Sequence, residues 1–121
     1  MEFVEAPAFT RLVSLYLDDD HYRALQAHLA GNPEAGDVVR GTGGFRKMRW
    51  QDARRGKGSR GGLRVVYYLF RDEAVIWLMT VYDKNDMEDL TPDQKRALRR
   101  AIQQERLERE TPRNRRARSE G

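Results

Sequence analysis

The chain contains 121 residues, of which 39% are hydrophobic and 35% charged, and its net charge is +4. This length supports one small folded core and excludes two independent ones, while the apolar content disfavours a wholly disordered chain. Because the sequence contains no cysteine, disulfides, thiolate zinc sites and iron–sulfur clusters are excluded.

The longest apolar run, residues 75–81, has the length of a strand and is far shorter than the roughly 18 residues that cross a bilayer. The first residues lack the cationic and apolar segments of a secretory signal. We therefore expect no membrane-spanning segment and a cytoplasmic location, which also fits the absence of cysteine.

The N-terminal part is predicted to form a short strand followed by two helices. Residues 3–5 have the pattern of an edge strand, and apolar residues then recur at helical spacing over residues 7–17. The three aspartates at 18–20 suit the beginning of a second helix, which should end at the Gly-Asn-Pro of residues 31–33. The glycines of residues 34–44 then predict a loop.

The next part is predicted to form the sheet. Residues 45–50 alternate large and basic side chains, as in a strand, and residues 51–62 form a basic, glycine-rich hairpin connection. Residues 63–70 and 74–82 are rich in β-branched and aromatic side chains, which predicts a central antiparallel pair of strands. Because these two strands are apolar on both faces, each face needs a cover.

A helix is predicted to begin with the capping box formed by Thr91, Pro92 and Gln94. Beyond Glu105 charged residues dominate, and residues 111–121 lack core-forming side chains. We therefore expect one domain over residues 1–110 and a basic, disordered tail over 111–121. The predicted fold class is α+β, with a small antiparallel sheet, two N-terminal helices packed on one face and a C-terminal helix.

Positive charge is concentrated in the middle of the chain. Residues 46–71 contain nine basic residues and one acidic residue, whereas residues 1–45 contain three basic and seven acidic residues. Clustered cations on an otherwise balanced domain favour polyanions, because neutralising phosphates releases condensed counterions. Nucleic acid is therefore the predicted partner class; a basic loop that only keeps the protein soluble is the alternative.

The strand ends are predicted to gather cations on one surface. Lys47 and Arg49 share one face of a strand, since side chains two apart point the same way. Arg64 begins the next strand, and Tyr82 and Lys84 end the strand after it, so that these ends converge in an antiparallel meander. Guanidinium and ammonium groups stabilise the charge of a phosphorane, which predicts a metal-free site for RNA cleavage. The predicted nonspecific contacts to RNA come from Arg46, Arg54, Arg55, Lys57 and Arg60.

Other designs of the site have weaker support. His21 and His28 are seven residues apart, two helical turns, which does not point to a shared metal ion. The acidic turn after residue 82 lacks the spacing of an EF-hand, and we expect no metal and no cofactor. No histidine is expected near the cationic surface, which excludes an imidazole base. Tyr82 is equally well explained as a half-buried packing residue with a hydrated hydroxyl.

Three segments, in this order, resemble the HigB toxins of the RelE/ParE toxin–antitoxin superfamily: residues 41–49 (GTGGFRKMR), 57–68 (KGSRGGLRVVYY) and 80–90 (TVYDKNDMEDL). The likeness extends from about residue 3 to residue 105. It implies a RelE-like fold and a bacterial toxin that cleaves mRNA on the translating ribosome without a metal, the ribose 2′-OH attacking the adjacent phosphate.

The resemblance also implies roles for individual residues. Arg64 would stabilise the phosphorane, and Lys47 and Arg49 would assist proton removal or bind the RNA backbone. Lys84, which follows Tyr82, would assist the leaving group.

The implied partners are the ribosome, mRNA and a HigA-like antitoxin with a helix-turn-helix DNA-binding domain, through which alone the toxin would reach operator DNA. No membrane partner is expected. Two alternatives stay open. One is a ParE-like inhibitor of DNA gyrase, and the other is a non-enzymatic module that binds RNA or the ribosome.

Overall fold

The computed structural model describes residues 1–53 and 62–120, with side chains as far as residue 110, and it has the α+β architecture predicted from the sequence. The elements of the described residues follow the order β1 (Glu2–Glu5), α1 (Pro7–Tyr16), α2 (Asp19–Gly31), β2 (Asp37–Val38), β3 (Arg46–Trp50), β4 (Leu63–Phe70), β5 (Val75–Asp83) and α3 (Pro92–Glu120). Within these residues, no helix combines the length and apolar character needed to cross a bilayer.

The chain divides into two compact units. The first, Met1–Val39 with Phe45–Asp89, contains the sheet, α1 and α2; the second, Arg40–Gly44 with Leu90–Gly121, contains α3. The candidate site lies in the first unit. The division at residue 110 into a domain and a tail stays a prediction.

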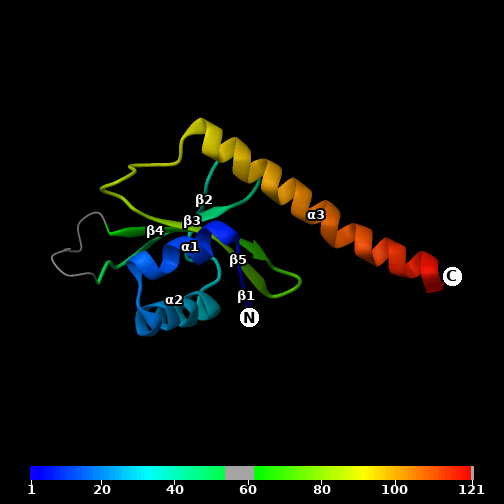
Figure 1. The fold of residues 1–121 in the computed structure, drawn as a ribbon, viewed down its shortest axis with the longest axis horizontal. Coiled ribbons are helices and arrows are strands. Elements are labelled where there is room, and N and C mark those ends of the chain that lie inside the picture. Colours follow the sequence, from blue (N-terminus) through cyan, green and yellow to red (C-terminus); the bar gives the residue numbers. More distant parts are fainter. Residues whose placement is uncertain (54–61, 121) are drawn as a thin grey trace. The chain divides into compact units, whose positions relative to one another are not determined.

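The five strands form one sheet in the order β1-β5-β4-β3-β2 (Figure 1). The central pair, β4 and β5, is antiparallel as predicted, and β3 pairs antiparallel with β4. The edge strand β1, however, runs parallel to β5, so the sheet is mixed rather than wholly antiparallel. No hairpin joins β1 to β5, because both helices and the other strands intervene, and the connection therefore imposes no antiparallel direction.

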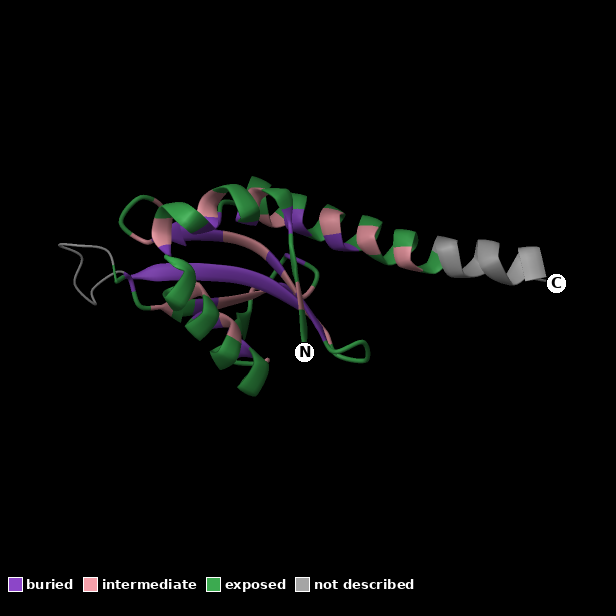
Figure 2. Ribbon diagram, turned by 60° about the horizontal axis from the view of Figure 1, so that its bottom comes forward, coloured by how far each residue is buried: buried purple, intermediate pink, exposed green. Residues whose placement is uncertain are grey.

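The hydrophobic core lies on one face of the sheet, where both N-terminal helices contribute. Phe9 of α1 and Leu25 of α2 are fully buried in one cluster with Val65 and Tyr67 of β4. Burying an aliphatic or aromatic side chain of this size stabilises the fold by about 1.5–3 kcal/mol. Figure 2 shows the central strands in purple, as buried elements.

An aromatic cluster occupies the other face of the same strands. Phe45 packs edge-on against Tyr68, with ring centroids 5.4 Å apart, and Trp77 and Phe70 continue the cluster at 5.9 Å from Phe45 and 4.8 Å from Tyr68, respectively. The residues of β4 from Leu63 to Tyr68 are all buried. The prediction that both faces of β4 are covered is thus confirmed.

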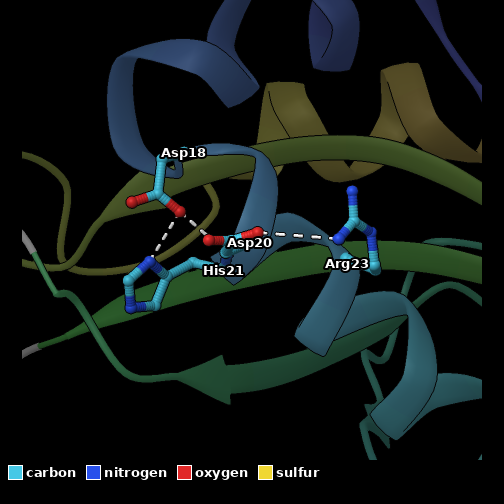
Figure 3. Close-up of polar contacts among 4 residues, drawn as sticks. All are labelled: Asp18, Asp20, His21 and Arg23. Carbon is cyan, nitrogen blue, oxygen red and sulfur yellow. Dashed lines mark hydrogen bonds and ion pairs between the residues drawn. The ribbon is translucent and has the colours of Figure 1, made fainter.

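The predicted beginnings of two helices are confirmed in atomic detail. The Asp18 carboxylate caps α2 by accepting the backbone N–H of His21 at 2.8 Å, and it also contacts the His21 ring (Figure 3). At α3, the Thr91 hydroxyl accepts from the backbone N–H of Gln94 at 3.1 Å, while the Gln94 side chain accepts from the Thr91 N–H at 2.8 Å. Both backbone donors are therefore satisfied reciprocally.

Helix α3 is longer than predicted, since its backbone is helical to Glu120, past residue 111, where we expected disorder. Arginine, which supplies four of the ten residues 111–120, has a favourable helix propensity. The segment predicted as a loop also contains the short strand β2 at the outer edge of the sheet, where Val38 is 56% exposed.

Candidate functional site

Three of the predicted site residues form a row across neighbouring strands. Arg49 of β3 lies directly opposite Arg64 of β4, and Arg64 lies directly opposite Tyr82 of β5. Directly opposed residues point to the same face of a sheet with Cβ atoms about 4.5–5.5 Å apart, where two like charges are destabilising. The fold thus places two guanidinium-bearing residues side by side where an anion would relieve their repulsion.

The same end of the sheet opens into a cleft of about 970 Å³. Four of the five residues predicted to carry the chemistry line this cleft: Lys47, Arg49, Arg64 and Lys84. Lys84 is held next to β4 by its backbone N–H, which donates to the carbonyl of Gly62 at 3.1 Å. The predicted convergence of the strand ends therefore occurs in the folded chain.

Arg64 is 6% exposed although it carries a charge, and it lines the cleft from the buried centre of the sheet. One of its terminal nitrogens donates to the backbone carbonyl of Leu63 at 3.2 Å. Burying a guanidinium is costly unless it is hydrogen-bonded or paired. A charge held in this way is preorganised to meet an anion entering the cleft.

Tyr82 is 6% exposed, so its hydroxyl is buried rather than hydrated. Among the residues that the structure describes, this hydroxyl has no hydrogen-bond partner. Burial raises the pKa of Tyr82; the nearby Asp89 carboxylate raises it further, and the Arg64 guanidinium opposes the change. The phenol is therefore protonated at neutral pH and can act as a hydrogen-bond donor.

Three acidic residues also line the cleft: Asp37 of β2, and Glu88 and Asp89 of the turn after β5. The buried Asp83 carboxylate accepts the backbone N–H of Asn85 at 2.8 Å, and the Asp83 carbonyl accepts from the amides of residues 86 and 87. The turn thereby returns Asp89 to β3, where its Oδ1 lies 2.8 Å from Nζ of Lys47. The contact between Asp89 and Lys47 could not be predicted from the sequence, because Asp89 is one of several acids in this turn.

His28 also lines the cleft, which corrects the prediction that no histidine lies near the cationic surface. It lies in the last turn of α2, and its ring packs on Trp50 of β3 with centroids 5.3 Å apart. No spacing in the sequence signals this contact, since α2 and β3 meet only through the tertiary fold.

Of the five residues predicted to contact RNA, Arg46 is described by the structure, and it does not line the cleft. Arg46 lies on the other face of β3 from Lys47, and its guanidinium donates to the carbonyl of Gly36 at 2.8 Å. Four predicted contacts lie outside the described residues: Arg54, Arg55, Lys57 and Arg60. In the part of the chain that is described, no group of three or more histidine, aspartate or glutamate side chains is placed to hold a metal ion.

The fold and the cleft define a small α+β protein with a mixed five-stranded sheet and a cationic cleft at one end of it. Several solved chains are similar to this chain, and two of them are as follows. A mutant of the Escherichia coli toxin RelE in the free state is 17% identical, with 72% of this chain and 86% of that chain covered and a TM-score of 0.49. The intact E. coli RelBE toxin–antitoxin complex is 16% identical, with coverages of 68% and 94% and a TM-score of 0.48. No protein-family model matches the chain.

Proposed function

We propose that this protein is the toxin of a type II toxin–antitoxin system and cleaves mRNA on the translating ribosome. The observation that carries this proposal is the convergence of Lys47, Arg49, Arg64 and Lys84 on one cleft. Four cations around one cavity suit the phosphodiester backbone of RNA, whose charge rises further in the transition state of strand scission.

The proposed reaction is an attack of the ribose 2′-OH on the adjacent phosphate, which leaves a 2′,3′-cyclic phosphate and a 5′-OH. Arg64, charged and fixed at the centre of the sheet, stabilises the pentavalent phosphorane. Lys47 and Arg49 bind the phosphate backbone, and Lys84 assists the departing 5′-oxygen. The ribosome contributes by holding the mRNA in line for attack, so free RNA is a poor substrate.

Mapping of mRNA 5′ ends in cells that express the wild type or Arg64→Ala tests this proposal. Removing one preorganised donor to a developing anion costs about 10²–10³-fold in rate, so cleavage and growth arrest should both be lost in the variant. Arg23→Ala is the matched control: Arg23 lies on α2, its side chain is 77% exposed, and it pairs with Asp20 at 3.6 Å (Figure 3). The control should cleave like the wild type.

Thermal unfolding of the purified variants separates a lost site from a lost fold, because Arg64 is buried. If a folded Arg64→Ala protein cleaved mRNA as the wild type does, the proposed site would be wrong. Induction of the DNA-damage response without mRNA cleavage would instead support the ParE-like gyrase inhibitor. Growth inhibition that persists after substitution of Arg64, Tyr82 and Lys84 together would support a non-enzymatic binding module.

An antitoxin with a helix-turn-helix DNA-binding domain is the proposed partner, and it rests on the resemblance of the sequence to HigB toxins. The protein of the adjacent reading frame, expressed together with this chain, should co-purify with it and suppress its toxicity. Operator DNA should bind the pair and not this chain alone.

A further inference from the structure

We propose that Asp89 is a catalytic residue, the base that accepts the proton of the attacking 2′-OH. This inference rests on the proposed function, since it assigns a role within the same reaction. Its starting point is the ion pair between Asp89 and Lys47, whose residues are 42 positions apart and meet at 2.8 Å at the wall of the cleft.

The Asp89 carboxylate lies where it weakens the binding of RNA, so its position needs an explanation other than substrate binding. A negative charge at the wall of a cleft that must admit a phosphodiester repels the substrate. A pair as exposed as this one, in which Lys47 is 28% and Asp89 55% exposed, contributes at most about 1 kcal/mol to folding. A large contribution to stability therefore does not explain why Asp89 pairs with a cation of the cleft.

Asp89 supplies an acceptor, which the cationic groups of the cleft lack. Asp37, Glu88 and His28 also line the cleft, and Asp89 is singled out by its direct ion pair with Lys47. Lysine and arginine side chains are protonated at neutral pH and are hydrogen-bond donors only. Burial raises the pKa of Tyr82, so its phenol also holds its proton. Asp89, when ionised, is an acceptor, and it lines the same cleft as Arg64 and Lys84.

The RNA phosphate would compete for the ammonium of Lys47 and so release the carboxylate beside the reacting ribose. The proton of the 2′-OH then passes to Asp89 while the 2′-oxygen forms its bond to phosphorus. The bond between phosphorus and the 5′-oxygen breaks, and that oxygen takes a proton from the ammonium of Lys84. Proton exchange with water afterwards restores both groups, so the reaction needs no oxidant, reductant or metal.

The test is single-turnover cleavage of a defined mRNA on purified ribosomes by the wild type, Asp89→Asn and the control Asp86→Asn. Asparagine keeps the size of the side chain but cannot accept the proton, so cleavage should slow by about 10²–10⁴-fold. Binding to ribosomes carrying an mRNA with a 2′-deoxy residue at the cleaved position should stay equal or become a few-fold tighter, since a negative charge is removed. Asp86 is exposed on the same turn and does not line the cleft, so its variant should behave like the wild type.

The rate and the affinity together decide between chemistry and structure. A slow Asp89→Asn variant with intact binding supports the inference. A variant that cleaves within about three-fold of the wild type would overturn it, and so would a parallel loss of binding, cleavage and melting temperature, which indicates a structural ion pair. If the wild type itself leaves the mRNA intact on the ribosome, the proposed function has failed rather than the role of Asp89.

Discussion

The hydroxyl of Tyr67 forms hydrogen bonds between the centre of the sheet and the loop that precedes β2. Removing this hydroxyl tests how much these bonds stabilise the wall of the cleft beside β2. The hydroxyl donates to the carbonyl of Pro33 at 2.8 Å and accepts from the backbone N–H of Gly36 at 2.9 Å. Gly36 lies so close to β3 that an added Cβ would be 3.0 Å from the backbone of Lys47. Phenylalanine keeps the buried ring, so Tyr67→Phe removes these two hydrogen bonds and little else.

The expected cost follows from the burial of the two partners. A buried amide left without a partner costs about 1–3 kcal/mol, and an ordinary hydrogen bond contributes about 0.5–1.5 kcal/mol. Gly36 is buried, whereas Pro33 is half-buried, and its carbonyl can be hydrated. We expect Tyr67→Phe to lower the free energy of unfolding by about 2–3 kcal/mol, and the melting temperature by about 8–12 °C at roughly 4 °C per kcal/mol.

Urea denaturation and thermal unfolding of purified proteins measure both quantities. Tyr22→Phe is the matched control, because the Tyr22 hydroxyl donates to the exposed carboxylate of Glu5 at 2.6 Å and water replaces it there. The control should lose about 1 kcal/mol or less. Equal losses in the two variants, or a loss below 1 kcal/mol for Tyr67→Phe, would refute the reasoning from burial.

Two further predictions concern local structure. The His21 amide lowers the pKa of Asp18 below its ordinary value of 3.8, so this helix cap stabilises the fold above that value, and the stabilisation is lost as the pH falls through the folded pKa. The melting temperature should therefore fall more steeply between pH 5 and pH 2 in the wild type than in Asp18→Asn, and parallel curves would contradict this. Gly43 has φ +79°, and an added Cβ would lie 2.9 Å from Ile102, so Gly43→Ala should lose about 1–2 kcal/mol in urea denaturation. Gly31→Ala, where nothing lies within 4 Å, should instead gain up to about 1 kcal/mol, and equal effects of the two substitutions would show that the contact is unimportant.

Features that depend on neighbouring residues could be predicted from the sequence. The Asp18 cap and the capping box at Thr91 involve residues three positions apart, so the backbone itself brings the partners together. The common face of Lys47 and Arg49 follows from the alternation of side chains along a strand. The same alternation places Arg46 on the opposite face, so its charge alone was a poor guide to its position.

The central antiparallel pair could also be predicted, because two apolar runs joined by a short turn pair in that direction. From this pairing followed the convergence of Arg64, Tyr82 and Lys84 on one end of the sheet, with Arg64 and Tyr82 directly opposite each other. The parallel direction of β1 could not be predicted, since the chain passes through two helices and three strands between Glu5 and its neighbours on β5.

Only the tertiary structure placed the groups that change the chemistry of the cleft. His28 reaches it from the end of α2, Asp89 pairs with Lys47 from 42 residues away, and the Tyr82 hydroxyl is buried. The sequence determined the local elements and the sign of the charge, because these depend on residue type and short spacing. Contacts between distant segments depend instead on how the elements pack, and this packing decided which acid and which imidazole meet the cations.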